Sequence, residues 1–111
     1  MMKPLDQQIA LEIRYERAIK LLLDLGLDHS CHHAKVAADV LLSANRADIT
    51  PYRRWPLYIS DLRILHEGEC NAALGVIHGR VTLNCLPEMV IQGGPALFHR
   101  LWHRWRNIEE W

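Results

Sequence analysis

Residues 4–26, PLDQQIALEIRYERAIKLLLDLG, form the stretch that decides the fold class. In a helix with about 3.6 residues per turn, five of its apolar side chains fall on one stripe. That stripe consists of Leu11, Tyr15, Ala18, Leu22 and Leu25. Gly26 follows directly, and a glycine after the last apolar position commonly ends a helix. The stretch therefore predicts an amphipathic helix from about Pro4 to Leu25, within an N-terminal helical segment that we place at residues 1–27.

A second apolar strip lies on the same predicted helix, about half a turn away from the first stripe. It contains Leu5, Ile9 and Ile13, with Glu16 and Lys20 among its charged neighbours. A small domain has difficulty covering every face of so long a helix. We therefore predict that Leu5, Ile9 and Ile13 bind a partner protein, and that the surplus apolar surface makes the chain a homodimer. The alternative stays open, since scattered exposed apolar residues are common and need no function.

The sequence after residue 27 predicts shorter helices. We place them at about 28–45, 60–65, 67–78, 87–92 and 95–108, with Gly79 and the Gly93–Gly94 pair as helix ends and Pro87 and Pro95 as helix starts. Residues 80–86 look like a strand, but a single strand would have no partner.

The segment 46–59 is predicted to be an ordered loop. Pro51 and Pro56 prevent a continuous helix there, while Ile49, Tyr52 and Trp55 are too apolar for a free linker. The chain as a whole is therefore predicted to be an all-α, compact single-domain bundle over residues 1–111. It has one long N-terminal helix and about four to five shorter helices.

Two of the shorter helices have predicted buried faces. In the segment 67–78 the buried positions are Cys70, Ala73, Leu74 and Ile77. In the last helix they are Leu97, Leu101, Trp105 and Ile108, with Phe98 and Trp102 at the edge of this face.

Composition excludes several function classes. Thirteen basic residues balance thirteen acidic ones, so no overall field attracts the chain to nucleic acid or to a membrane surface. The N-terminal residues contain no apolar signal-peptide region, and no uncharged apolar run approaches the roughly 18 residues that span a bilayer. Three widely spaced cysteines, Cys31, Cys70 and Cys85, are typical of free thiols in a reducing compartment. We expect a cytoplasmic protein.

The cluster His29-Ser-Cys31-His32-His33 contains residue types that bind zinc. All four candidate ligands lie within five residues at a helix start, where they cannot all converge on one ion. We expect a polar helix entrance with Cys31 packed inward, and no metal site.

The last helix carries His99 and His103 at the spacing of a metal-binding pair. A zinc protease motif would place a glutamate directly after the first histidine, where this chain has Arg100. We expect a solvated basic face there. Nothing near Cys85 or His78 orients a base or builds an oxyanion hole. We therefore expect no catalytic residues, no cofactor and no enzymatic activity.

Binding of nucleic acid is the alternative function that the sequence leaves open. Arg100, Arg104 and Arg106 alternate with Trp102 and Trp105 on the last helix, as cations and aromatic rings do in proteins that bind single strands. The balanced net charge and the absence of a recognised reading motif speak against it.

Three segments resemble a family of small helical proteins from proteobacteria: AADVLLSA at 37–44, ISDLRIL at 59–65 and GGPALFHRLW at 93–102. The resemblance covers roughly residues 34–105 and leaves the first helix outside. It implies a quorum-sensing anti-activator that, as a dimer, binds the ligand-binding domain of a LuxR-type transcription activator and blocks the activator's dimerisation. The shared segments are packing signatures, so no functional residue is carried over from the family.

Overall fold

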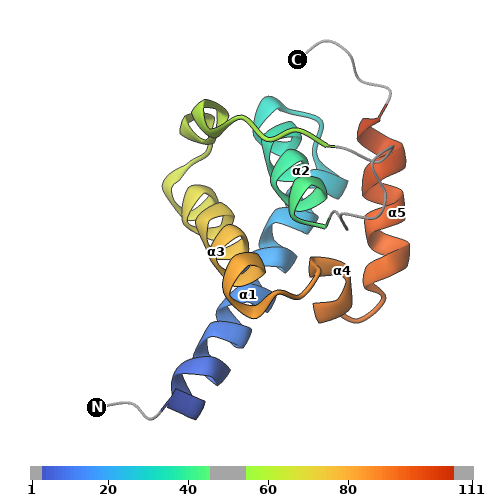
Figure 1. Cartoon of the computed structure of the whole chain (residues 1–111). Coiled ribbons are helices and arrows are strands. Elements are labelled where there is room, and N and C mark those ends of the chain that lie inside the picture. The colour runs from blue at the N-terminus through green and yellow to red at the C-terminus, as the bar shows by residue number, and fades with distance from the viewer. Residues whose placement is uncertain (1–3, 46–54, 107–111) are drawn as a thin grey trace.

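The computed structural model describes residues 4–45 and 55–106, which form five α-helices and one 3-10 helix with no strand (Figure 1). The all-α prediction is confirmed. The elements are α1 Pro4–Asp28, α2 His32–Ala44, η2 Ile59–Ile64, α3 Glu67–Leu83, α4 Pro87–Val90 and α5 Gly94–Trp105. The predictions for Ile49, Pro51, Tyr52 and Ile108 fall outside the described residues. None of the described helices is both long and apolar enough to cross a membrane.

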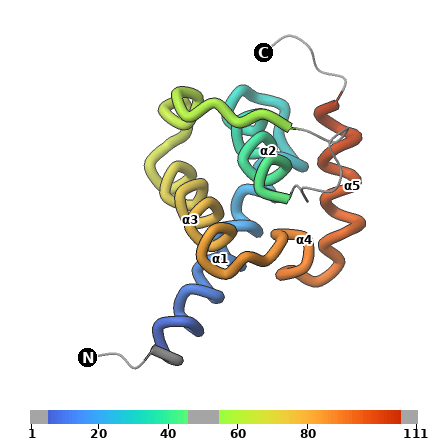
Figure 2. Tube along the Cα trace, in the orientation of Figure 1, coloured from blue at the N-terminus to red at the C-terminus, as the bar shows by residue number. Residues whose placement is uncertain are grey.

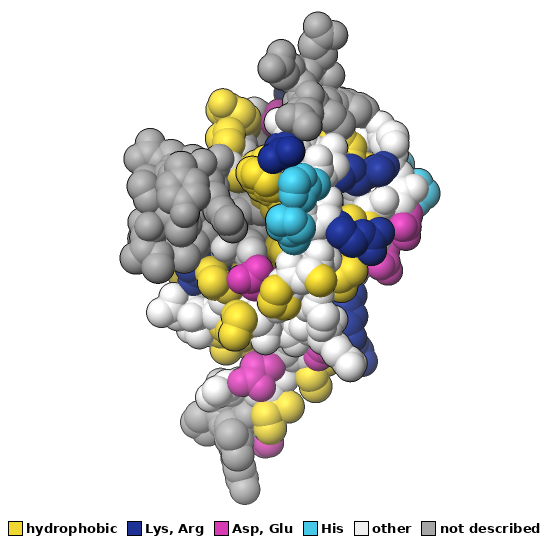
Figure 3. Space-filling view, turned by 90° about the vertical axis from the view of Figure 1, so that its right-hand side faces the viewer, with side chains coloured by type: hydrophobic (Ala, Val, Ile, Leu, Met, Phe, Trp, Pro, Cys, Tyr) yellow, Lys and Arg dark blue, Asp and Glu magenta, His cyan; other side chains and the backbone are white. Residues whose placement is uncertain are grey.

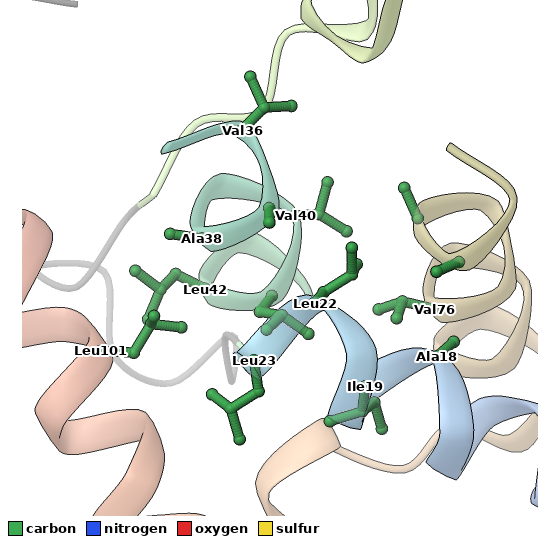
Figure 4. Close-up of a cluster of buried hydrophobic side chains, with 14 of the residues drawn as sticks. Ala18, Ile19, Leu22, Leu23, Val36, Ala38, Val40, Leu42, Val76 and Leu101 are labelled. Atoms are coloured by element: carbon green, nitrogen blue, oxygen red, sulfur yellow. The ribbon is translucent and has the colours of Figure 1, made fainter. Parts of the chain in front are cut away.

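The C-terminal half of α1 forms the centre of the fold. It packs against α2, α3 and α5, and Tyr15, Ile19 and Leu22 are completely buried there. Figure 4 shows Ile19 and Leu22 of α1 among apolar residues of the three neighbouring helices, including Val40, Val76 and Leu101. The N-terminal turns of α1 instead project beyond the other helices, as the tube in Figure 2 makes plain. One helix therefore has a buried half and a projecting half.

Two glycines that we predicted to end helices lie inside helices instead. A Cβ at Gly26 would lie 2.9 Å from Cδ1 of Leu101, and the Trp105 indole N–H donates to the Gly26 carbonyl oxygen at 2.8 Å. A Cβ at Gly79 would lie only 2.3 Å from Cδ1 of Tyr15. Both glycines therefore permit close contact between helices, and the predicted ends at Leu25 and before Gly79 are wrong.

The strand-like run at 80–86 is also helical at its start. α3 continues through it to Leu83, and Asn84 then ends the helix in the left-handed conformation with φ 50°. The amide of Asn84 donates to the Arg80 carbonyl, which closes the last turn. The β-branched residues in this run did not outweigh the packing of α3 against α1.

Two side chains predicted to be buried are exposed. Leu74 is 49% exposed, because α3 turns the face with Ala73 and Val76 toward α1 and α2. Cys31, predicted to pack inward, is exposed at the N-cap of α2. On α5, Leu101 and Trp105 are buried as predicted.

The chain that follows the 46–54 segment is tied to α2 through a buried carboxylate. Asp39 is 5% exposed, and its Oδ1 accepts hydrogen bonds from the Trp55 indole at 2.8 Å and from Lys35 Nζ one turn away. A buried carboxylate needs such partners, because desolvation without them is costly. Trp55 thus fixes the start of the segment that leads to η2.

Candidate functional site

The exposed apolar strip predicted on the first helix is present on the projecting half of α1. Ile9 is 47% exposed and Ile13 is 44% exposed, whereas Ile19 in the other half is fully buried. Leu5, the third residue of the predicted strip, belongs to α1, but its side chain lies outside the described part of the structure. The structure therefore places Ile9 and Ile13 where a partner can reach them.

A groove of about 400 Å³ runs beside this strip. Its first wall is α1, and its second wall comes from the end of α3, the connector after it and α4. The groove is lined by Gln8, Ile9, Glu12, Ile13, Tyr15, Glu16, Leu83, Cys85, Met89 and Val90. Met89 is 68% exposed, so the second wall also offers an apolar side chain to solvent.

The second wall of the groove was not predicted from sequence. Leu83 fell in the run that looked like a strand, and no pattern connects Met89 with α1 across some eighty residues. The available signal was local: an exposed methionine in a very short helix that starts with Pro87. Methionine is flexible and is common at surfaces that adapt to partners.

Tyr15 joins the two walls at the floor of the groove. Its hydroxyl donates to the Cys85 carbonyl oxygen at 2.6 Å, which holds the connector after α3 against α1. Burial raises the pKa of Tyr15 to about 12; the nearby Cys85 adds to this rise and Arg80 opposes it. The phenol is therefore neutral at physiological pH, and the floor carries no charge.

α4 is held in place by polar contacts with the end of α2. The Asn45 side chain donates to Glu88 Oε2 at 3.2 Å and accepts from the Glu88 backbone N–H at 2.9 Å. Behind α4, a Cβ at Gly94 would lie 1.9 Å from the Glu88 carbonyl oxygen, so only glycine fits there. These contacts make the second wall a fixed part of the fold.

The α1 rim of the groove is acidic. Glu12 accepts a hydrogen bond from Gln8 at 3.3 Å, and Glu16 pairs with Lys20 at 2.9 Å. Both contacts link residues on exposed turns of α1, where screening by water and salt keeps such pairs weak. Figure 3 shows hydrophobic and acidic side chains next to each other on the part of the molecule that tapers toward this end of α1.

The predicted basic face lies on α5, and no residue of α5 lines the groove. Figure 3 shows histidine side chains flanked by Lys and Arg on this side of the molecule. The Arg106 guanidinium lies 4.7 Å from the Trp102 ring centre, and the Arg104 guanidinium donates to the Ser30 hydroxyl at 2.8 Å. Desolvation, followed by the positive charge of Arg106 and by His99, lowers the pKa of His103. His103 therefore adds less positive charge to this face than a histidine with an ordinary pKa would.

Histidines from the predicted cluster have different surroundings. The structure brings His33 together with His66 and Glu69 from the start of α3, and their ligand atoms lie within 4.8 Å of one another. His29, Cys31 and His32 do not belong to this group. Sequence reasoning missed it, because it compared only neighbours along the chain.

Comparisons of this chain with protein-family models, with curated proteins and with solved structures find no match.

Proposed function

We propose that the chain is a non-enzymatic regulatory protein that binds another protein through the groove beside Ile9 and Ile13. The observation that carries this proposal is the contrast in exposure within α1. Two isoleucines face solvent beside a preformed groove, whereas Ile19 and Leu22 in the other half of the same helix are completely buried. Exposed apolar side chains grouped at a groove are typical of protein-binding sites.

The resemblance noted in the sequence gives the proposed partner. Residues 34–105 resemble the quorum-sensing anti-activator QslA, which implies binding to the ligand-binding domain of the LuxR-type activator LasR. In this proposal the chain occupies the dimerisation surface of the activator. Activators of this kind bind two half-sites as dimers, so a separated monomer loses half of its phosphate and base contacts. The inhibitor then needs no basic surface of its own.

The groove specifies the chemistry of the segment that it accepts. Ile9, Ile13 and Met89 offer apolar contact, and Glu12 carries negative charge on the rim. The matching segment is an apolar helix or strand of the activator with a lysine or arginine at its edge. Such a charge steers association and fixes register more than it adds affinity.

We further propose that two copies of the chain associate through α3. Leu74 and Val81 are seven residues apart on one face of α3 and are 49% and 76% exposed. Because the activator takes the α1 groove in this proposal, the α3 face is left for the second copy. Sedimentation should then show a dimer at micromolar concentration, and Leu74→Asp with Val81→Asp should shift it to the monomer. A wild-type monomer contradicts this part of the proposal.

Light scattering on mixtures with the ligand-bound LasR domain tests the proposed function. With excess chain, we expect the activator homodimer to disappear and a mixed complex to form. A mobility-shift assay should show full-length LasR released from its operator at the same concentrations. An activator that stays dimeric and DNA-bound in excess chain contradicts the proposal.

The alternative is direct binding of nucleic acid by α5. The exposed Arg100, Arg104 and Arg106, with Arg106 over the half-buried Trp102, favour it. Against it, Trp105 is 1% exposed, so its ring cannot stack on a base. The same mobility-shift assay separates the two functions. A band shift by the chain alone that weakens steeply with salt supports the alternative.

A further inference from the structure

Three potential metal ligands from two helices lie close together at the end of the molecule where α2 and α3 begin. His33 lies in the first turn of α2, His66 is the N-cap of α3, and Glu69 lies in the first turn of α3. His33 Nδ1 lies 3.2 Å from Glu69 Oε1, and the His33 and His66 ring centres are 4.4 Å apart. All three ligand atoms lie within 4.8 Å of one another.

The fold holds these side chains in place before any ligand binds. Glu69 Oε1 accepts a hydrogen bond from the backbone N–H of His66 at 2.9 Å, as the N3 residue of a capping box does. This contact fixes the carboxylate beside the His66 side chain. The side chains of His33 and Glu69 are 28% and 20% exposed, so both are also held by packing. Preorganised ligands lose little conformational entropy when an ion binds.

The capping box and the hydrogen bond position all three side chains. The box places the His66 side chain at the backbone N–H of Glu69, and the His66 ring lies against His33. Two imidazoles brought together repel each other if both are protonated, whereas two neutral imidazoles can bind the same cation.

We propose that His33, His66 and Glu69 bind one divalent transition-metal ion, with Zn²⁺ as the best match. Imidazole nitrogen and carboxylate oxygen are common zinc ligands, whereas Ca²⁺ and Mg²⁺ prefer all-oxygen sites. Two ligands bonded at about 2.0–2.1 Å in a tetrahedron lie about 3.3–3.4 Å apart. The observed spacings of 3.2 Å and at most 4.8 Å need side-chain movements of only about one ångström to reach this geometry.

A bound ion links α2 to α3 and keeps a coordination position open. Three protein ligands are one fewer than the four of a closed zinc site, and His66 borders solvent. Water or a donor atom from another molecule fills the remaining position. This site uses none of the residues that line the α1 groove, so its test is independent of the test of the proposed function.

Isothermal titration of the tag-free, chelator-treated chain with ZnCl₂ tests the site. We expect one high-affinity ion per chain, and a Co²⁺ complex with visible absorption. His66→Ala should weaken binding at least tenfold and keep the helical fold, because the Glu69 half of the cap uses the His66 backbone N–H and only the side-chain half is lost. Glu69→Gln, which keeps a side-chain acceptor for the cap, should weaken it as well.

The matched control is the double substitution His99→Ala and His103→Ala. This pair has the same 4.4 Å ring separation and lies on the exposed face of α5, but it lacks a carboxylate ligand from a second element. It should leave zinc affinity unchanged. Zinc should also raise the melting temperature of the wild type and of this control, because an ion that binds only the folded state stabilises it. The proposal is overturned if the wild type binds no zinc, or if His66→Ala binds it as tightly as the wild type.

Discussion

The two halves of α1 have similar apolar residues and opposite surroundings. In the C-terminal half, Ile19 is completely buried among α2, α3 and α5. In the N-terminal half, Ile9 and Ile13 are nearly half exposed beside a groove. The helix is continuous between them from Pro4 to Asp28. The difference teaches that helical periodicity identifies an apolar face, whereas the rest of the fold decides whether that face becomes core or surface.

The groove half is also built differently from the core half. Ile19 belongs to a cluster of buried apolar side chains, and the helices of the core approach closely at Gly26 and Gly79. The groove is assembled by polar bonds at its margins, such as Tyr15 to the Cys85 carbonyl and Asn45 to Glu88. The exposed apolar residues of the groove stabilise the fold little by packing on one another. The two walls therefore depend on these polar bonds for their position.

The same substitution in the two halves should give the largest contrast. Ile19→Asp buries a carboxylate with no partner, which costs several kcal/mol, of the order of the about 5–15 kcal/mol total stability of a small domain. We expect this variant to be unfolded by circular dichroism. Ile9→Asp is the matched control and should fold normally. A folded Ile19→Asp variant would show that this half of α1 is not core.

Trp105→Ala should have the next largest effect. The ring is 1% exposed, and its N–H satisfies the Gly26 carbonyl at the C-terminal end of α1. We expect a loss of about 3–5 kcal/mol in the free energy of unfolding, as for other large aromatic truncations in cores. Urea denaturation measures it. A change within experimental error would place the α5 tryptophan on the surface and favour the nucleic-acid alternative.

Gly79→Ala tests the close contact between α3 and the buried part of α1. The added methyl group would meet the Tyr15 ring at 2.3 Å, so either the ring or the helix must move. We expect a loss of about 1–3 kcal/mol from overpacking. Gly68→Ala on the same helix is the control, because a Cβ there meets nothing within 4 Å. Equal melting temperatures for the two variants would contradict the account.

Tyr15→Phe tests the floor of the groove, and of these substitutions it should lower stability least. Losing the hydrogen bond to Cys85 should cost about 0.5–1.5 kcal/mol near neutral pH. The folded chain holds the phenolic proton more tightly than the unfolded chain, since the pKa rises from 10.0 to about 12. The contribution of this proton to the stability of the folded chain is complete below about pH 10 and is lost as the pH rises toward 12.

Denaturation of the wild type and the Phe variant across this alkaline range gives the comparison. We expect the stability of the wild type to fall more steeply with pH than that of Tyr15→Phe. Parallel curves would mean that the hydroxyl is not buried against the connector.

The sequence predicted the helical class, the N-terminal helix and the exposed strip, because each depends on spacing within a few turns. It failed where distant segments meet. Gly26 and Gly79 looked like helix ends, and only the neighbouring Leu101 and Tyr15 explain why glycine is needed inside the helices. The second wall of the groove and the group of His33 with His66 are further cases, since a single sequence carries no pattern that links residues from separate helices.

The most direct test of the account is the binding affinity of the double variant Ile9→Asp and Ile13→Asp for the LasR ligand-binding domain. Both side chains are already nearly half exposed, so the melting temperature and helicity should stay close to the wild type. Carboxylates buried without partners at an interface cost several kcal/mol, so the affinity should fall at least a hundredfold. A variant that unfolds would make the strip part of the core. If the wild type binds LasR and the folded variant binds it equally tightly, the interface lies elsewhere and the account is contradicted.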